Sequence, residues 1–398
     1  MNKQNSSLLF PIVLVFYELI LYMANDMYLP SLPSLVKDLA ITQDLAQYTL
    51  TLWFLGTASL QLIIGPCSDR YGRKKVLLIG AYCFTIASMI CALTHNFIWL
   101  LAARFIQGAA VCSIGVAGYA AIHELYDSKT AIKIISLMAS ITILGPALGP
   151  LVGAIILKIA NWRYIFIALG ISGFLSILQL SKVMPETNKQ KTVINFKETI
   201  SDYLTITFRR EFLAYTLTLC FSFISFIIWI VESPFIIIES HQQTEIYYGI
   251  IQLVIFSFFI IGTQITRYLL RKTSTLNIIS LGLFLSLLGA LLLLGSSFAA
   301  QLSLNLVALS MSLVALGSAI ASGPLSRGAI DACQEPMGRV MAISSTFMGI
   351  FGVLGTFVIN IFQYKNIQNL AYVIIICMTL SYLIFYFART KQVVKAAI

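Results

Sequence analysis

Twelve apolar runs, each about 20 residues long, recur along the 398-residue chain. About 20 apolar residues in a helix cross the hydrocarbon core of a bilayer, and lipid favours helices because they satisfy their own backbone hydrogen bonds. The composition agrees, because 59% of the residues are hydrophobic and 11% are charged, against roughly 25% charged in soluble domains. We therefore predict an all-α integral membrane protein with twelve transmembrane helices, at residues 8–34, 45–66, 75–94, 97–121, 132–157, 162–181, 211–238, 246–269, 275–295, 301–322, 337–362 and 368–388.

The longest polar segment, residues 182–210, divides the twelve spans six and six. This segment is rich in lysine and arginine, which predicts a cytoplasmic linker between an N-terminal half, 1–181, and a C-terminal half, 211–398. A faint repeat at a spacing of 197 residues supports the division. It aligns Gly65, Asp69, Arg70 and Tyr71 with Gly262, Thr266, Arg267 and Tyr268.

The net charge of +10 is distributed as membrane topology requires. If both termini lie in the cytoplasm, 21 of the 26 lysines and arginines fall on the cytoplasmic side, and only Arg104 lies deep in a span. The four on the outer side are Lys37, Lys158, Arg163 and Lys365. This bias predicts a multi-pass protein with cytoplasmic termini, and it argues against a nucleic-acid-binding surface.

The chain offers little for enzymatic chemistry. Its seven cysteines are scattered without a Cys-x-x-Cys pair, and its three histidines lie in separate segments. No glycine-rich nucleotide-binding loop is present. We expect no metal, no cofactor and no enzymatic activity.

A charged turn between the second and third runs reads Gly65-Pro-Cys-Ser-Asp69-Arg70-Tyr-Gly72-Arg73-Lys-Lys-Val76. We expect Gly65 to let two helices approach closely, Asp69 to meet an arginine or a helix dipole, and Gly72 to turn the chain. Arg70, Arg73 and the two lysines would hold the turn in the cytoplasm. Topological anchoring alone explains the basic residues but not the spacing of the glycines and Asp69.

Ionisable residues inside a span are costly and usually functional. The first span holds Glu18 and Asp26, which share one helix face with Tyr22 and Asn25. The two carboxylates are separated by about 12 Å of helix rise, and the polar face predicts a water-filled cavity. The alternative is that Asp26 lies at the membrane interface, close to Pro30.

Two further buried charges need an explanation. Arg104 lies inside the fourth span and requires a partner, for which Asp26, backbone carbonyls or water are candidates. Glu232 precedes Ser233-Pro234 near the outer end of the seventh span, where it lines a cavity mouth or sits at the interface.

The fifth span contains a proline- and glycine-rich string, with Gly145, Pro146, Gly149 and Pro150 followed by Gly153. Prolines in a helix interior bend it, and glycines four residues apart let another helix approach closely. We predict a kinked, closely packed helix here.

These motifs together resemble the drug/proton antiporters of the major facilitator superfamily. The turn at 65–76, Arg104-Phe-Ile-Gln-Gly108 and Gly145-Pro-Ala-Leu-Gly149-Pro150 carry the resemblance. Tyr17-Glu-x-x-x-Tyr-x-x-Asn-Asp-Met27, Gly118-Tyr-Ala-Ala-Ile122 and Gly149-Pro-Leu-Val-Gly-Ala154 are similar to the MdfA-type multidrug branch of that family. The similarity is best over residues 8–186.

The resemblance implies the major facilitator fold, with two six-helix halves, and a monomer in a bacterial inner membrane. It implies that Glu18 and Asp26 exchange protons for lipophilic, often cationic drugs, that Arg104 tunes them, and that the pocket is lined by Tyr22, Asn25 and Tyr119. The Gly/Pro string would limit leak. Glu232 matches no position of the pattern, which leaves the substrate charge open.

Two alternatives remain at this stage. A proton-coupled transporter of one metabolite, such as a siderophore or a sugar, would need a pocket dense in hydrogen-bonding groups. A channel or a non-transporting receptor would not need kinked helices in repeated halves.

Overall fold

The computed structural model describes residues 9–188, 196–298, 303–335, 337–362 and 367–397, and these residues form helices joined by short turns, without a strand. The chain divides into two units, Met1–Asn195 and Phe196–Ile398, here called the first and the second half. The division falls inside the predicted linker, of which 189–195 lies outside the described residues, as does Lys365.

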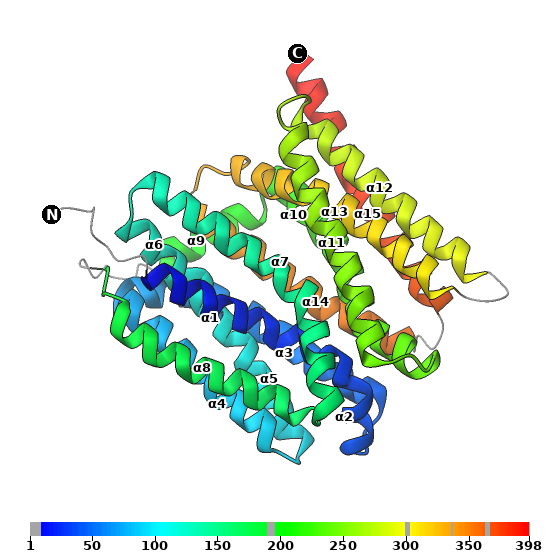
Figure 1. The fold of residues 1–398 in the computed structure, drawn as a ribbon. Helices are drawn as coiled ribbons and strands as arrows, with labels where there is room; N and C mark the ends of the chain where they lie inside the picture. The colour runs from blue at the N-terminus through cyan, green and yellow to red at the C-terminus, as the bar shows by residue number, and fades with distance from the viewer. Residues whose placement is uncertain (1–8, 189–195, 299–302, 336, 363–366, 398) are drawn as a thin grey trace. The chain divides into compact units, whose positions relative to one another are not determined.

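The described part of the first half contains ten helical segments (Figure 1). They are α1 (Leu9–Asp26), η2 (Leu29–Ser31), α2 (Leu32–Asp38), α3 (Gln43–Tyr71), α4 (Arg73–Leu93), α5 (Phe97–Ser113), η3 (Ile114–Gly118), α6 (Tyr119–Leu125), α7 (Ser128–Ile159) and α8 (Arg163–Val183).

Eight helical segments lie in the described residues of the second half. They are α9 (Phe196–Thr207), α10 (Arg210–Pro234), η4 (Phe235–Ser240), α11 (Glu245–Leu269), α12 (Thr275–Ser297), α13 (Leu304–Asp331), α14 (Met337–Phe362) and α15 (Ile367–Ala397).

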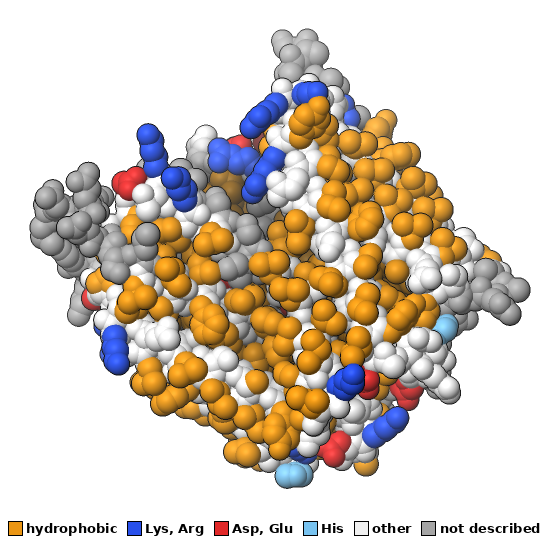
Figure 2. Space-filling view, in the orientation of Figure 1, with side chains coloured by type: hydrophobic (Ala, Val, Ile, Leu, Met, Phe, Trp, Pro, Cys, Tyr) orange, Lys and Arg blue, Asp and Glu red, His pale blue; other side chains and the backbone are white. Residues whose placement is uncertain are grey.

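The predicted membrane-spanning class is confirmed. Eleven helical stretches in the described part of the chain are long and apolar enough to cross a bilayer, and α7 adds a shorter apolar segment, Ile143–Ile159. Figure 2 shows hydrophobic side chains along the sides of the helices, with lysines and arginines gathered near the helix ends. This is the distribution that a bilayer requires.

The first span is longer than predicted and is interrupted. The α-helix ends at Asp26, a 3₁₀ turn at Leu29–Ser31 accommodates Pro30, and α2 continues to Asp38. The whole stretch counts as one span of 30 residues. Asp26 therefore lies inside this 30-residue stretch and is buried, with 5% of its surface exposed.

Helix α7 also begins earlier than predicted, because Asp127 caps it. The Asp127 carboxylate accepts hydrogen bonds from the N–H groups of Lys129 (3.1 Å) and Thr130 (3.3 Å). The hydroxyl and the N–H of Thr130 hold the pKa of Asp127 below its usual value.

Glycines set the closest helix contacts in each half. In the first, α3 and α5 meet where a Cβ on Gly56 or Gly108 would collide with the backbone of the other helix. In the second, a Cβ on Gly262 of α11 would lie 2.6 Å from the Leu316 carbonyl oxygen of α13. Backbones approach this closely only where side chains are missing. Both halves thus pack a glycine of one span against the neighbouring span.

The expectation for Gly65 is not met in this half. A Cβ on Gly65 would meet no atom within 4 Å, so this glycine brings no helix close there. The close contact of α3 lies about two and a half turns earlier, at Gly56.

The second part of the predicted linker forms α9, which packs on α14. Asp202 of α9 forms an ion pair with Arg339 of α14. Arg209, between α9 and α10, pairs with Glu335 at 2.7 Å, just before α14. These pairs attach the linker helix to the second half.

Candidate functional site: buried charges in the first half

Helix α7 holds the polar end of α1 through its glycines. A Cβ on Gly149 would lie 2.6 Å from the Asp26 Cβ, and one on Gly145 would lie 2.9 Å from the Tyr22 Cβ. A Cβ on Gly153 would collide with the Met27 carbonyl. The predicted close approach of this string is confirmed, and its partner is the segment that carries Asp26.

Arg104 is fully buried on α5, with 0% of its surface exposed. Its Nη1 donates to the Ala24 carbonyl oxygen (3.2 Å) and to Gln107 Oε1 (2.9 Å). Its Nη2 donates to Asn25 Oδ1 (3.0 Å), and Nε donates to the Thr49 carbonyl oxygen (3.4 Å). The guanidinium therefore joins α1, α3 and α5 at one depth.

All four of these acceptors are neutral oxygens. Among the ion pairs of the described residues none joins Arg104 to Asp26, and the link between the two side chains runs through Asn25. The Asn25 amide bonds Arg104 through its oxygen, and its Nδ2 lies 3.5 Å from Asp26 Oδ1. Of the candidate partners of Arg104, backbone carbonyl oxygens are found. Asp26 is linked to Arg104 by hydrogen bonds only through Asn25.

Several side chains around Arg104 were not predicted as site residues. The guanidinium carbon lies 4.9 Å from the centre of the Tyr28 ring and 5.9 Å from that of Phe166, within the range of cation–π attraction. Gln107, which accepts from Arg104, donates to Ser88 Oγ at 2.8 Å. Gln107 could have been predicted, because it lies one helical turn from Arg104 on α5. The neighbours from α3, α4 and α8 could not, because they lie far from Arg104 in the sequence.

Glu18 lies two turns before Asp26 on α1 and is 1% exposed. Its Oε1 accepts a hydrogen bond from the Tyr119 hydroxyl at 3.0 Å. Its buried Oε2 has no hydrogen-bond partner among the described residues. Tyr119 follows a π-helical turn, Ile114–Gly118, a feature frequent at functional sites. The predicted pair of Glu18 and Tyr119 is thus brought together, with one carboxylate oxygen left open.

Glu232 lies in the second half, on α10, and is buried, with 4% of its surface exposed. The next residue, Ser233, accepts from Gln252 Nε2 (2.9 Å), and Gln252 Oε1 accepts from Trp229 Nε1 (3.2 Å). The π-helical η4 begins directly after Pro234. Gln252 and Trp229 are polar core groups that the sequence analysis missed.

The charged turn between α3 and α4 forms an ion-pair network. Gly72 has φ +103°, a conformation that favours glycine, and it turns the chain as predicted. Arg73 pairs with Asp69 (2.5 Å) and with Glu124 in the last turn of α6 (3.1 Å). Asp69 therefore meets an arginine, and the turn is tied to the end of α6.

Glu186, which follows α8, was not predicted and completes this network. Its carboxylate accepts from the first two N–H groups of α4, those of Arg73 (2.9 Å) and Lys74 (3.3 Å). A carboxylate there satisfies free amides and complements the helix dipole. Asn188 donates to the Asp69 carbonyl oxygen at 2.6 Å. The start of α4 is thus held by the segment after α8.

The described residues contain no group of three or more His, Cys, Asp or Glu side chains placed to hold a metal ion. The buried cluster instead combines one fixed cation, Arg104, with two carboxyl groups that can each bind a proton. Its total charge therefore changes with protonation, and a cation or a proton can compensate it.

Known proteins are similar to this chain over most of its length. The profile of the Major Facilitator Superfamily matches residues 14–356. The multidrug transporter MdfA of Yersinia pestis bv. Antiqua (strain Angola) is 32% identical over 350 residues, which cover 88% of this chain and 86% of that protein. The chloramphenicol resistance protein CraA of Acinetobacter baumannii (strain ATCC 19606) is 32% identical over 344 residues, 86% of this chain and 83% of that protein.

Solved structures agree on the fold. A D-xylose–proton symporter aligns with a TM-score of 0.77 at 16% identity, covering 96% of this chain and 98% of that one. A bacterial homologue of the lysosomal transporter Spinster aligns with a TM-score of 0.70 at 15% identity, over 98% and 96% of the two chains. Membrane-spanning helices and a family profile matching most of the sequence agree that this chain is a membrane transporter, not an enzyme, and that it belongs to the Major Facilitator Superfamily.

Proposed function

We propose that this protein exports lipophilic, often cationic drugs from the cell in exchange for protons. The relatives that match it over most of its length are named multidrug transporters and a chloramphenicol resistance protein. In this proposal the protein acts as a monomer in a bacterial inner membrane, with both termini in the cytoplasm.

The observation that carries the proposal is the unsatisfied carboxyl group of Glu18. A buried carboxyl oxygen without a hydrogen-bond partner raises the free energy of the folded protein. A proton or a cation that reaches this oxygen therefore stabilises the site. The apolar and aromatic surroundings of Glu18, which include Tyr22 and Tyr119, suit a lipophilic ligand.

Asp26 and Arg104 would provide the second proton-binding step. Arg104 keeps its charge, so protonating Asp26 leaves a buried positive charge that repels a cationic drug. Deprotonating Asp26 restores neutrality and lets the drug bind near Glu18, Tyr22 and Asn25. The proton and the cationic drug therefore compete for the same negative charge, and this competition couples their two fluxes.

Alternating access would use the charged turn and the Gly/Pro string. The network of Asp69, Arg73 and Glu124 ties three helix ends together, and its breakage or formation would bias the inward-open and outward-open states. Arg70, Gly65 and Gly72 belong to the same turn. Gly145, Pro146, Gly149 and Pro150 would let α1 slide on α7 without leak. Glu232 would contribute to substrate binding from the second half.

The test is uptake of tetraphenylphosphonium, a lipophilic cation, by proteoliposomes with an imposed pH gradient. We expect uptake that stops when an ionophore collapses the gradient, and that is lost in Glu18→Gln and Asp26→Asn. Asp331→Asn, which changes an exposed carboxylate (side chain 55% exposed), is the matched control and should transport normally. Uptake that survives collapse of the gradient would rule out proton exchange.

A further inference from the structure

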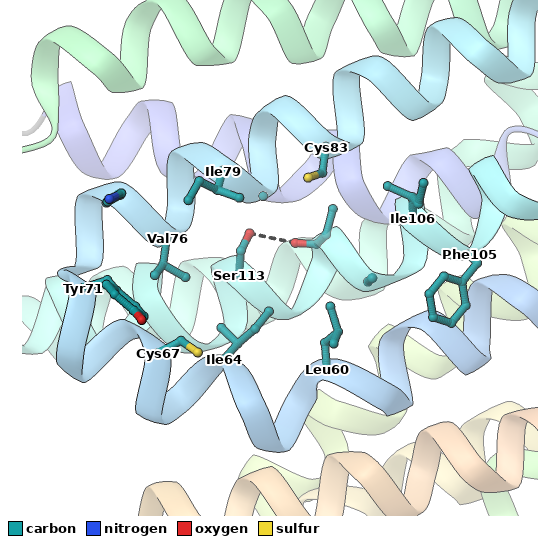
Figure 3. A pocket seen from close by; sticks show the side chains of 14 residues that line it. Leu60, Ile64, Cys67, Tyr71, Val76, Ile79, Cys83, Phe105, Ile106 and Ser113 are labelled. Carbon is teal, nitrogen blue, oxygen red and sulfur yellow. Dashed lines mark hydrogen bonds between the residues drawn. The ribbon is translucent and has the colours of Figure 1, made fainter. Parts of the chain in front are cut away.

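A groove on the side of the first half lies outside the charge cluster (Figure 3). Its volume is about 560 Å³. Helices α3 and α4 form its walls and both pack on α5, which forms its floor, while they contact each other far less. The surface is apolar, from Leu60 and Ile64 of α3 and Val76 and Ile79 of α4 to Ile106 and Ala109 of α5.

One end of the groove is basic. Tyr71 and Lys75 line it there, beside the turn between α3 and α4. The Lys75 ammonium lies 5.9 Å from the centre of the Tyr71 ring, and the Arg70 guanidinium carbon lies 5.3 Å from it. Neither cation is ion-paired with a carboxylate among the residues that the structure describes. Two uncompensated positive charges thus flank the opening.

The length of the groove matches one leaflet of a bilayer. Lys75 and Cys83 both line it, and eight residues of α4 rise about 12 Å along the helix axis. Half of a hydrocarbon core is about 15 Å thick. A chain that enters beside Lys75 therefore ends close to the middle of the membrane, beyond Cys83.

We propose that this groove binds a phospholipid, with one acyl chain between α3 and α4 and the phosphate beside Lys75 and Arg70. The apolar walls fit the acyl chain, and the unpaired cations favour an anionic headgroup such as that of phosphatidylglycerol. The bound lipid bridges the two helices that flank Gly72, next to the ion pair of Asp69 and Arg73.

The test is native mass spectrometry of the detergent-purified full chain, titrated with phosphatidylglycerol or phosphatidylethanolamine. We expect the wild type to retain phosphatidylglycerol preferentially. Lys75→Met should weaken that binding about fivefold, the effect of one charge near an anionic surface. Lys74→Met is the matched control, because the Lys74 ammonium donates to the Ser181 carbonyl oxygen (2.8 Å) and does not line the groove. It should bind as the wild type does.

A second variant tests the acyl chain separately from the headgroup. Cys83→Phe places a ring in the groove on the α4 side, about two helical turns from Lys75. Cys83 is exposed, so the fold should tolerate the change; circular dichroism and gel filtration check this. It should lower retention of both lipids. Equal weakening by Lys74→Met and Lys75→Met, or unchanged lipid retention in folded Cys83→Phe, would overturn the proposal. Displacement of the lipid by tetraphenylphosphonium in the wild type would also overturn it, because the groove would then be a drug-binding site.

Discussion

Replacing Arg104 by lysine keeps a buried positive charge but removes the guanidinium fork. The fork makes four hydrogen bonds to oxygens on three helices, and a single ammonium on a shorter stem can keep about one of them. Three lost bonds at roughly 1 kcal/mol net each amount to about 3 kcal/mol. For a unit the size of the first half, that corresponds to a fall in Tm of about 6–12 °C.

The assay is thermal unfolding of the purified protein in detergent, followed by far-UV circular dichroism. Arg327→Lys is the matched control, because the Arg327 side chain is 68% exposed and pairs with Asp331 one turn away. The same chemical change there should shift Tm by about 2 °C or less. If Arg104→Lys shifts Tm no more than Arg327→Lys does, the four bonds do not stabilise the first half and the reasoning fails.

A double-mutant cycle with the same assay separates the two neighbours of Arg104. Because Asn25 bonds Arg104 directly and Asp26 only through Asn25, the coupling of Arg104 to Asn25 should exceed its coupling to Asp26. The variants are Arg104→Ala combined with Asn25→Ala or with Asp26→Asn. A larger coupling to Asp26 would show a direct charge pair instead.

Two further predictions concern packing and gating. Gly153→Ala should lower Tm markedly, because its Cβ would collide with the backbone of Met27, directly after α1. Gly295→Ala, whose Cβ would meet no atom within 4 Å, should not lower Tm. Equal shifts would contradict the packing of this segment on α7. Glu186→Gln keeps the shape of the cap on α4 but weakens it, so it should slow drug uptake into proteoliposomes while equilibrium drug binding stays within about twofold of the wild type. A large loss of binding would instead place Glu186 in the drug site.

The fold class and the charged residues of the site were predictable because they follow from local signals. Runs of apolar residues reveal spans, and a carboxylate such as Glu18 in such a run demands an explanation. The glycines at 149 and 153 were readable as a contact surface for the same reason, since four residues bring them onto one face.

The partners of these residues were not predictable, because they come from distant parts of the chain. Thr49 of α3 and Phe166 of α8 contact Arg104, and Ser88 of α4 bonds its neighbour Gln107, yet nothing in their own segments marks these residues. Glu186 lies in a polar segment where a carboxylate needs no explanation. The prediction for Gly65 was wrong for a different reason. A glycine permits a close helix contact but does not require one, and the packing of the helices decides whether the contact forms.

The most direct test of the account is to measure protons released when drug binds to the purified protein. Tetraphenylphosphonium added to the detergent-solubilised chain in weakly buffered solution should acidify the medium, because drug and proton compete for Glu18 and Asp26. The double variant Glu18→Gln/Asp26→Asn should release no protons. Drug binding to the wild type without acidification, or equal acidification by the double variant, would contradict the proposal that these two carboxyl groups exchange protons for drug.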